Sequence, residues 1–71
     1  MPKMIPVESS LIAEIGYEDE KEELYVEFKR GGLYMYQGVP KPVFTAMLNA
    51  ISKGKFFLDN VKNQYEYVKV K

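Results

Sequence analysis

Residues 24–36, Leu24-Tyr25-Val26-Glu27-Phe28-Lys29-Arg30-Gly31-Gly32-Leu33-Tyr34-Met35-Tyr36, read as a β-hairpin. On both sides of residues 29–32, Leu, Val, Phe and Met alternate with Tyr and Glu, which is the pattern of strands with one covered face. The two glycines supply the positive φ angles that a tight turn needs. With Arg30-Gly31 as a two-residue turn, the predicted register pairs Phe28 with Leu33, Glu27 with Tyr34, Val26 with Met35, and Tyr25 with Tyr36.

This register gives the hairpin two unlike faces, because successive side chains of a strand point to opposite sides. The first face is entirely apolar and is expected to belong to the core: Leu24, Val26, Phe28, Leu33 and Met35. The second face is rich in tyrosine and has polar tips: Tyr25, Glu27, Tyr34 and Tyr36.

The sequence before the hairpin predicts one more strand. Apolar residues occupy the odd positions of Leu11–Tyr17, and Ile12 breaks this alternation in a way that indicates a bulge. The charged segment Glu18–Glu22 has the length of a hairpin connection. We therefore expect a three-stranded antiparallel β-sheet (β-β-β) in which each strand is joined to the next by a turn.

The sequence after the hairpin predicts two short α-helices, which makes the fold class α+β. Pro40 and Pro42 suit a helix entry, and apolar residues follow at helical spacing until Ser52-Lys53-Gly54, a predicted C-terminal stop. A second helix is expected around Phe56–Val61. The tail Tyr65–Lys71 has high β propensity and lysines that suit an exposed edge strand.

The length of 71 residues leaves room for one hydrophobic core. We expect residues 1–8, which contain two prolines, to be extended or disordered, and residues 9–71 to form a single domain. The chain has no Cys and therefore no disulfide. We expect a cytoplasmic protein with no membrane partner, because the sequence shows neither a signal peptide nor an apolar run long enough to span a bilayer.

The net charge of zero hides an asymmetry along the chain. Eight acidic residues and two lysines lie up to Phe28, whereas eight basic and two acidic residues follow it. Such a chain can fold into a dipolar molecule with one basic surface that attracts phosphates. Alternatively, the two halves neutralise each other in the fold.

Catalysis has little support in the sequence. Without His or Cys the chain lacks the most common general base and the most reactive nucleophile. The acidic cluster Glu18–Glu23 lacks the glycine and the spacing of a calcium loop, and Lys53-Gly54-Lys55 lacks the rest of a phosphate-binding loop. We predict no catalytic residue, no metal and no cofactor; an enzyme using Ser9, Ser10 and tyrosines is the least favoured alternative.

The tyrosine-rich face is the strongest candidate for a binding site. Unpaired bases stack on aromatic rings while cations hold phosphates, so the sequence predicts binding of RNA or single-stranded DNA. The expected stacking residues are Tyr25, Tyr34 and Tyr36, and the expected phosphate contacts are Lys29, Arg30, Lys53 and Lys55. Two alternatives stay open: the same rings cover a second small core, or the face or a sheet edge binds another protein or a second copy.

Six short motifs in order give the chain a family resemblance. They are Val7-Glu8-Ser9-Ser10-Leu11-Ile12, Ile15-Gly16-Tyr17, Leu24-x-Val26-x-Phe28, Gly32-x-Tyr34-x-Tyr36, Gly38-Val39-Pro40 and Ser52-x-Gly54-x-Phe56-Phe57. Together they resemble the KTSC domain, a small domain named for its occurrence at the C-terminus of some lysyl-tRNA synthetases. That association implies an RNA-binding role, which agrees with the prediction from the tyrosines. The chain departs from the family where Leu58 follows the two phenylalanines in place of the usual Asn.

Overall fold

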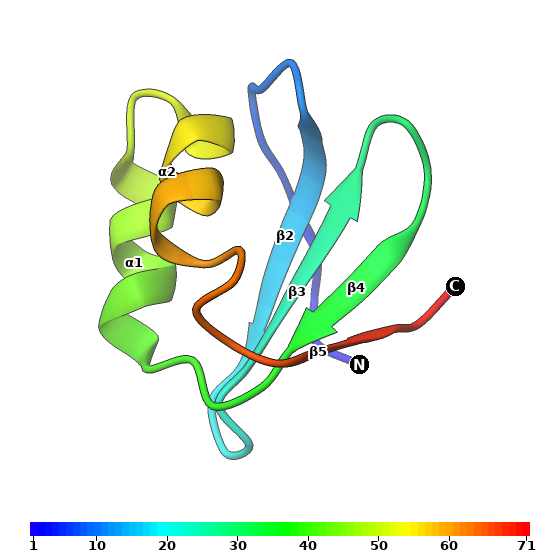
Figure 1. Ribbon diagram of the computed structural model, residues 1–71, viewed down its shortest axis with the longest axis vertical. Helices are drawn as coiled ribbons and strands as arrows, with labels where there is room; N and C mark the ends of the chain where they lie inside the picture. The colour runs from blue at the N-terminus through cyan, green and yellow to red at the C-terminus, as the bar shows by residue number, and fades with distance from the viewer.

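Five strands and two helices follow one another in the computed structural model, which describes residues 1–71 (Figure 1). They are β1 (Ile5–Pro6), β2 (Ile12–Glu18), β3 (Glu23–Phe28), β4 (Leu33–Tyr36), α1 (Lys41–Asn49), α2 (Lys53–Asn60) and β5 (Tyr67–Lys69). The strands form one antiparallel sheet in the order β1-β2-β3-β4-β5. The fold is α+β with two helices, as predicted, but the sheet has five strands rather than three because short segments at both ends of the chain join it.

The hairpin forms with a longer turn than the predicted Arg30-Gly31 pair. Its loop is the three residues 29–31, closed by a hydrogen bond of 3.1 Å from the Phe28 N–H to the Gly32 carbonyl. The Gly31 N–H also donates to the Phe28 carbonyl at 2.9 Å, and both glycines have positive φ. A tight turn followed by a glycine with positive φ is a common three-residue hairpin loop.

The longer loop shifts the register by one residue, so every predicted pair in this hairpin is wrong. The observed partners are Leu24 with Tyr36, Tyr25 with Met35, Val26 with Tyr34, and Glu27 with Leu33. A shift of one residue moves every side chain of β4 to the other face of the sheet. Tyr34 and Tyr36 therefore lie on the helix-facing side, and the predicted core residues Leu33 and Met35 lie on the opposite side.

The side of the sheet that faces away from the helices is called the outer face below. Cross-strand pairing places Gly16, Tyr25, Met35 and Val68 in one row on it, and Glu14, Glu27 and Leu33 in the next. Part of this face is covered by the N-terminal segment. A β-carbon on Gly16 would lie 2.8 Å from the Met4 sulfur and 2.9 Å from the Lys3 carbonyl, so only glycine permits this close approach.

The bulge indicated by Ile12 lies between Ile12 and Glu14, where the register of β2 against β3 shifts. The extra residue turns Ile12 toward the core, where its side chain is fully buried. The first of the two predicted helices is confirmed as α1, and Pro42 lies in its first turn. Ser52, however, does not end α1: it is the N-cap of α2, and its hydroxyl accepts a hydrogen bond from the Lys55 N–H.

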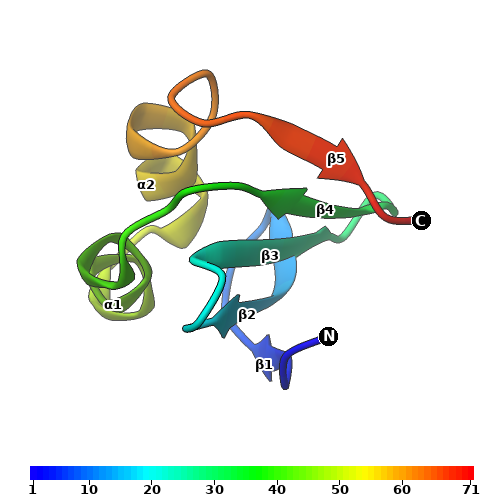
Figure 2. The same ribbon diagram turned by 90° about the horizontal axis from the view of Figure 1, so that it is seen from below.

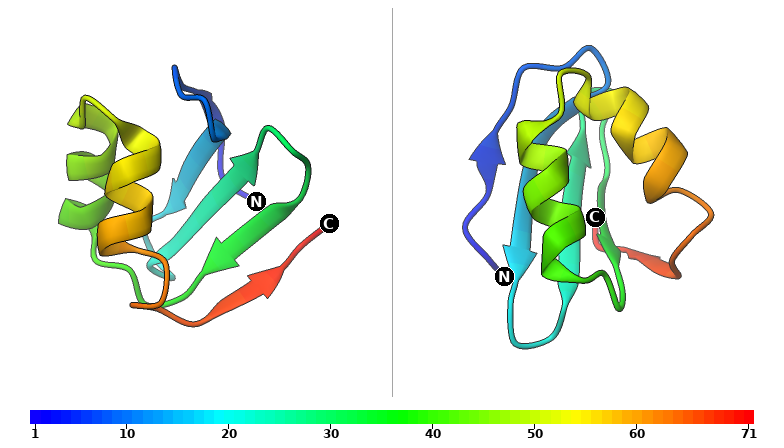
Figure 3. Two further views of the ribbon diagram at one scale, coloured as in Figure 1. Left: turned by 45° about the horizontal axis from the view of Figure 1, so that its top comes forward. Right: turned by 90° about the vertical axis from the view of Figure 1, so that its left-hand side faces the viewer.

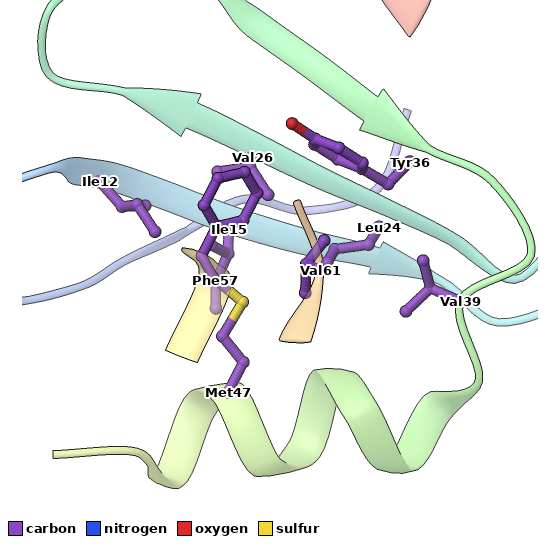
Figure 4. Close-up of a cluster of buried hydrophobic side chains, with 9 residues drawn as sticks. All are labelled: Ile12, Ile15, Leu24, Val26, Tyr36, Val39, Met47, Phe57 and Val61. Atoms are coloured by element: carbon purple, nitrogen blue, oxygen red, sulfur yellow. The ribbon is translucent and has the colours of Figure 1, made fainter. Parts of the chain in front are cut away.

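The core lies between the two helices and the sheet (Figure 4). Its nine buried residues are Ile12, Ile15, Leu24, Val26, Tyr36, Val39, Met47, Phe57 and Val61. At the margin of the core the Tyr17 and Phe44 rings stack at 5.1 Å, and the Tyr17 hydroxyl donates to the Val39 carbonyl at 2.6 Å. Gly54 lets α2 approach the chain before β2, because a β-carbon there would already lie 3.3 Å from the Leu11 β-carbon.

The helices cover the helix-facing side unevenly. In the right-hand view of Figure 3, α1 lies in front of β2 and β3, whereas the chain after α2 loops to the side and returns as β5. Figure 2 shows the same connection running from α2 across to the β5 edge. Strands β4 and β5 therefore lie to the side of α1 rather than beneath it. Neither helix is long and apolar enough to cross a membrane.

An aromatic groove as the candidate binding site

A hollow of about 510 Å³, called the aromatic groove below, lies on the helix-facing side of the sheet, where α2 and its C-terminal connection face strands β3, β4 and β5. The volume falls within the range of roughly 300–1,000 Å³ that is usual for small-ligand sites. Strands β3, β4 and β5, the hairpin turn, α2 and the connection after it all contribute to the lining. The lining residues are Leu11, Phe28, Arg30, Gly31, Tyr34, Tyr36, Phe57, Leu58, Lys62, Asn63, Tyr65 and Tyr67.

Five rings of the groove form one continuous cluster. Phe28 meets Phe57 edge to face at 5.3 Å and Tyr34 at 5.5 Å, while Tyr36 meets Phe57 at 5.4 Å. Tyr67 contacts both Tyr34 and Tyr36, with ring centroids 5.5 and 5.6 Å apart. The corrected register produces this cluster, since it brings Tyr34 and Tyr36 to the same face as Phe28 and Tyr67.

The cluster grades from buried to exposed. Phe57 and Tyr36 are 2% and 5% exposed and belong to the core, whereas Tyr67 is 59% exposed. The rings therefore serve two purposes: the inner ones hold the fold together, and the outer ones offer a surface. Tyr36 thus belongs to the main core rather than to a second small core, and Tyr67 is the most exposed ring of the cluster.

Burial raises the pKa of the Tyr36 phenol to about 12, with further contributions from the neighbouring Tyr67 and Tyr34. The Tyr67 and Tyr34 phenols are thus close enough to oppose ionisation of Tyr36. At neutral pH the Tyr36 hydroxyl keeps its proton, so it can donate a hydrogen bond within the groove.

The raised pKa predicts a loss of stability in alkali. The native state holds the Tyr36 proton up to about pH 12, while the unfolded chain releases it near pH 10. This proton difference leaves the free energy of unfolding unchanged below pH 10 and lowers it between pH 10 and 12, by at most about 3 kcal/mol in all. Urea titrations across this range should show the decline, and Tyr36→Phe should lack this component; an equal decline in both proteins would contradict the assignment.

The charges of the groove lie on its rim and are all positive. Arg30 in the hairpin turn and Lys62 after α2 belong to the lining, which contains no acidic residue. Lys69 is the cross-strand partner of Tyr34 and adds a third cation on the same side of the sheet. Asn63 is held at a φ of 68° where the chain leaves α2, a backbone conformation that Asn tolerates better than most residues.

The structure separates the residues that the sequence analysis grouped as one binding surface. Tyr34, Tyr36 and Arg30 line the aromatic groove. Tyr25 lies on the outer face, where its hydroxyl donates to a Glu23 carboxylate oxygen at 3.2 Å. Lys29 is exposed in the hairpin loop and does not belong to the lining.

Lys53 and Lys55 line a different hollow, which lies at the start of α2. Its volume, 670 Å³, exceeds that of the groove, but no aromatic residue lines it and both Glu8 and Asp59 do. Lys55 is already paired with Asp59 at 2.7 Å, and Lys53 donates to the Ala50 carbonyl at 2.8 Å. This second hollow therefore lacks the stacking surface on which the prediction of base binding depended.

The outer face is acidic, and its carboxylates oppose one another. Glu14 is the direct cross-strand partner of Glu27, and Glu18 is that of Glu23. None of the four takes part in the two ion pairs of the protein, of which only Lys41–Asp19 joins the acidic and basic parts of the chain. No group of three or more His, Cys, Asp or Glu side chains is arranged to hold a metal ion. The outer face thus carries opposed negative charges, whereas the charged residues that line the groove are positive.

The opposed carboxylates predict that Glu27→Gln stabilises the protein. Like charges directly opposite each other in a sheet are unfavourable, so removing one should raise the free energy of unfolding by about 0.2–1 kcal/mol. Urea denaturation at low salt measures the gain, which should shrink as salt screens the repulsion. A loss of stability, or a gain insensitive to salt, would show that the repulsion is not the cause.

Several residues of the groove were not among the predicted site residues. The sequence predicts Phe28 as a core residue, and it predicts Tyr65 and Tyr67 in an edge strand, where they would either complete the tyrosine-rich face or bury it. Lys62 and Asn63 follow the end of a short helix, where they carry no periodic signal. The only indication in the sequence is the interleaving of cation, amide and aromatic residues from 62 to 67.

Comparisons with known proteins agree with the fold. The KTSC domain family model matches residues 8–65, so the chain belongs to the KTSC domain family. The crystal structure of a KTSC domain protein from Yersinia pestis superimposes with a TM-score of 0.97 at 34% sequence identity, covering 100% of both chains. An uncharacterized protein of Stutzerimonas stutzeri (strain A1501) is 39% identical over 69 residues, which are 96% of this chain and 97% of that protein. A lysine–tRNA ligase of Trichormus variabilis is 36% identical over 64 residues, which are 90% of this chain but 11% of the ligase.

Proposed function

We propose that this KTSC domain is a non-enzymatic module that binds RNA or single-stranded DNA in the aromatic groove. One observation carries the proposal: the groove joins a continuous surface of rings to a rim of cations and has no acidic lining residue. Bases stack on such rings, and cations beside them hold the phosphates. The similarity to a part of lysine–tRNA ligases, whose name includes a tRNA, supports RNA as the ligand.

The groove divides the expected roles among its residues. Tyr67 and Tyr34 offer the accessible rings and are assigned to stacking, whereas Tyr36 supports them from the floor. Arg30 and Lys62 are assigned to phosphate contacts, because they are the cations of the lining. The acidic outer face directs a polyanion to the groove side, since like charges repel there.

A matched pair of double variants tests the placement of the phosphate contacts. Arg30→Ala/Lys62→Ala and Lys53→Ala/Lys55→Ala each remove two positive charges, the first inside the groove and the second outside it. Titration of labelled single-stranded RNA and DNA at two salt concentrations should show a loss of about tenfold or more for the first variant only, since each charge-assisted hydrogen bond contributes about 1.5 kcal/mol or more. Equal losses in both variants, or no binding by the wild type at low salt, would contradict the proposal.

A second candidate function is protein–protein interaction or self-association at the β5 edge. Strand β5 lies at the edge of the sheet. Its Val68 is 48% exposed, and Val70, which follows the strand, is 44% exposed. A free edge with apolar residues can accept a strand from another chain. Sedimentation over a wide concentration range without nucleic acid would reveal self-association. A monomer at every concentration would exclude self-association.

A further inference from the structure

We propose that the aromatic groove takes one unpaired nucleotide at a time, with its base against the rings and its phosphate at the rim. The inference rests on the proposed function and narrows it. Its ligand is a nucleotide at a strand end or extruded from a helix, rather than a long single-stranded tract. Three features of the groove support it: its lining, its ring surface and the small number of its cations.

Residues from several separate segments line the groove. The connection after α2 contributes Asn63 and Tyr65 to the lining. It runs from the helix to β5 (Figures 2 and 3). Leu11 and the Arg30-Gly31 turn contribute to the lining from the chain before β2 and from the hairpin. A lining drawn from so many segments favours a single nucleotide entering from the solvent side over a strand lying lengthwise between α2 and β5.

The rings of the groove form one surface rather than a row of slots. Tyr34 and Tyr67 are in mutual contact at 5.5 Å, and Tyr67 contacts Tyr36 at 5.6 Å, so no base fits between these neighbours. A base must lie over the cluster, where the phenol hydroxyls and the Asn63 side chain can meet its edge. The volume of 510 Å³ is that of a site for one ligand of this size.

The charges of the groove separate base from phosphate. Arg30 and Lys62 are the only charged residues of the lining, and the ring cluster itself is uncharged. A neutral base is thus accepted inside, and about two phosphates can be held at the rim. Proteins that follow a nucleic-acid backbone instead make many such contacts, and their affinity falls steeply with salt.

Ligands of increasing length test the inference. Adenosine 5′-monophosphate, a dinucleotide and an octanucleotide are titrated into the full chain by NMR. The dinucleotide should bind within about tenfold of the octanucleotide. For the octanucleotide, the slope of log affinity against log salt should be near −1.4, from about 0.7 for each of two phosphates. Affinity that rises steadily with length, with a slope steeper than about −4, would overturn this inference while leaving the proposed function in place. Binding of none of the three ligands would instead overturn the proposed function.

A fluorescent base distinguishes the two sources of an unpaired nucleotide. One 2-aminopurine is placed as a terminal overhang in one RNA duplex, as a bulge in a second and within the paired region of a third. Stacking on the tyrosines should change the fluorescence of the overhang, the bulge or both, and leave the paired position unchanged. Tyr67→Ala should abolish the change, with Tyr25→Ala on the outer face as the matched control. An unchanged signal in both the overhang and the bulge would overturn the inference.

Discussion

Alanine at position 57 is expected to lower the free energy of unfolding by about 3–5 kcal/mol, the usual cost of removing a buried phenylalanine side chain. Phe57 is 2% exposed and packs edge to face with both Phe28 and Tyr36, so its loss leaves a cavity beneath the aromatic groove. Small domains have total stabilities of the order of 5–15 kcal/mol. The variant should therefore be largely unfolded or denature at much lower urea concentration.

The neighbouring Leu58 provides a matched control for this prediction. It lies on the same helix and lines the same groove, but 50% of it is exposed. Leu58→Ala should therefore cost only a fraction of the Phe57→Ala effect in the same urea titration. If both variants were equally stable, the aromatic cluster would not be part of the core.

The largest expected effect on function is that of replacing Tyr34 and Tyr67 together by alanine. Each base–aromatic stack contributes about 1–3 kcal/mol, so removing both rings should weaken binding of single-stranded RNA by at least about tenfold. The fold should persist, because Tyr67 is largely exposed and Tyr34 is only half-buried. Fluorescence anisotropy measures the affinity, and circular dichroism verifies the fold.

Tyr25→Ala is the control that separates the two faces of the sheet. Tyr25 has the same side chain and lies on the strand next to Tyr34, but it points to the acidic outer face. Its replacement should leave the affinity within about twofold of the wild type. If Tyr25→Ala abolished binding and the double variant did not, the nucleic acid would lie on the outer face.

Local signals in the sequence were sufficient to predict the secondary structure of the hairpin and the helices. Alternation and glycines located β3 and β4, and proline and apolar spacing located α1. The predicted faces of β4 are wrong, because a hairpin loop of two residues and one of three fit the same glycines and differ only in the geometry of Gly31 and Gly32. Ser52 begins α2 instead of ending α1 as predicted, because a serine before Lys-Gly can end one helix or begin the next.

The candidate site could be predicted only in part for the same reason. Of the predicted site residues, Tyr34, Tyr36 and Arg30 line the groove. Tyr67 and Lys62 join them through long-range packing of β5 and α2, which no local pattern encodes. Lys53 and Lys55 belong to α2, as does Phe57 of the groove, but they line the separate hollow at the start of this helix.

The central claim is that nucleic acid binds in the aromatic groove and not elsewhere on the domain. Backbone ¹H–¹⁵N NMR spectra of the labelled full chain, recorded during titration with a short single-stranded RNA, test it most directly. We expect the signals of Arg30, Tyr34, Lys62 and Tyr67 to shift as the RNA is added, while those of Glu14 and Tyr25 stay in place. Shifts confined to the outer face or to Lys53 and Lys55, or no shifts at low salt, would contradict it.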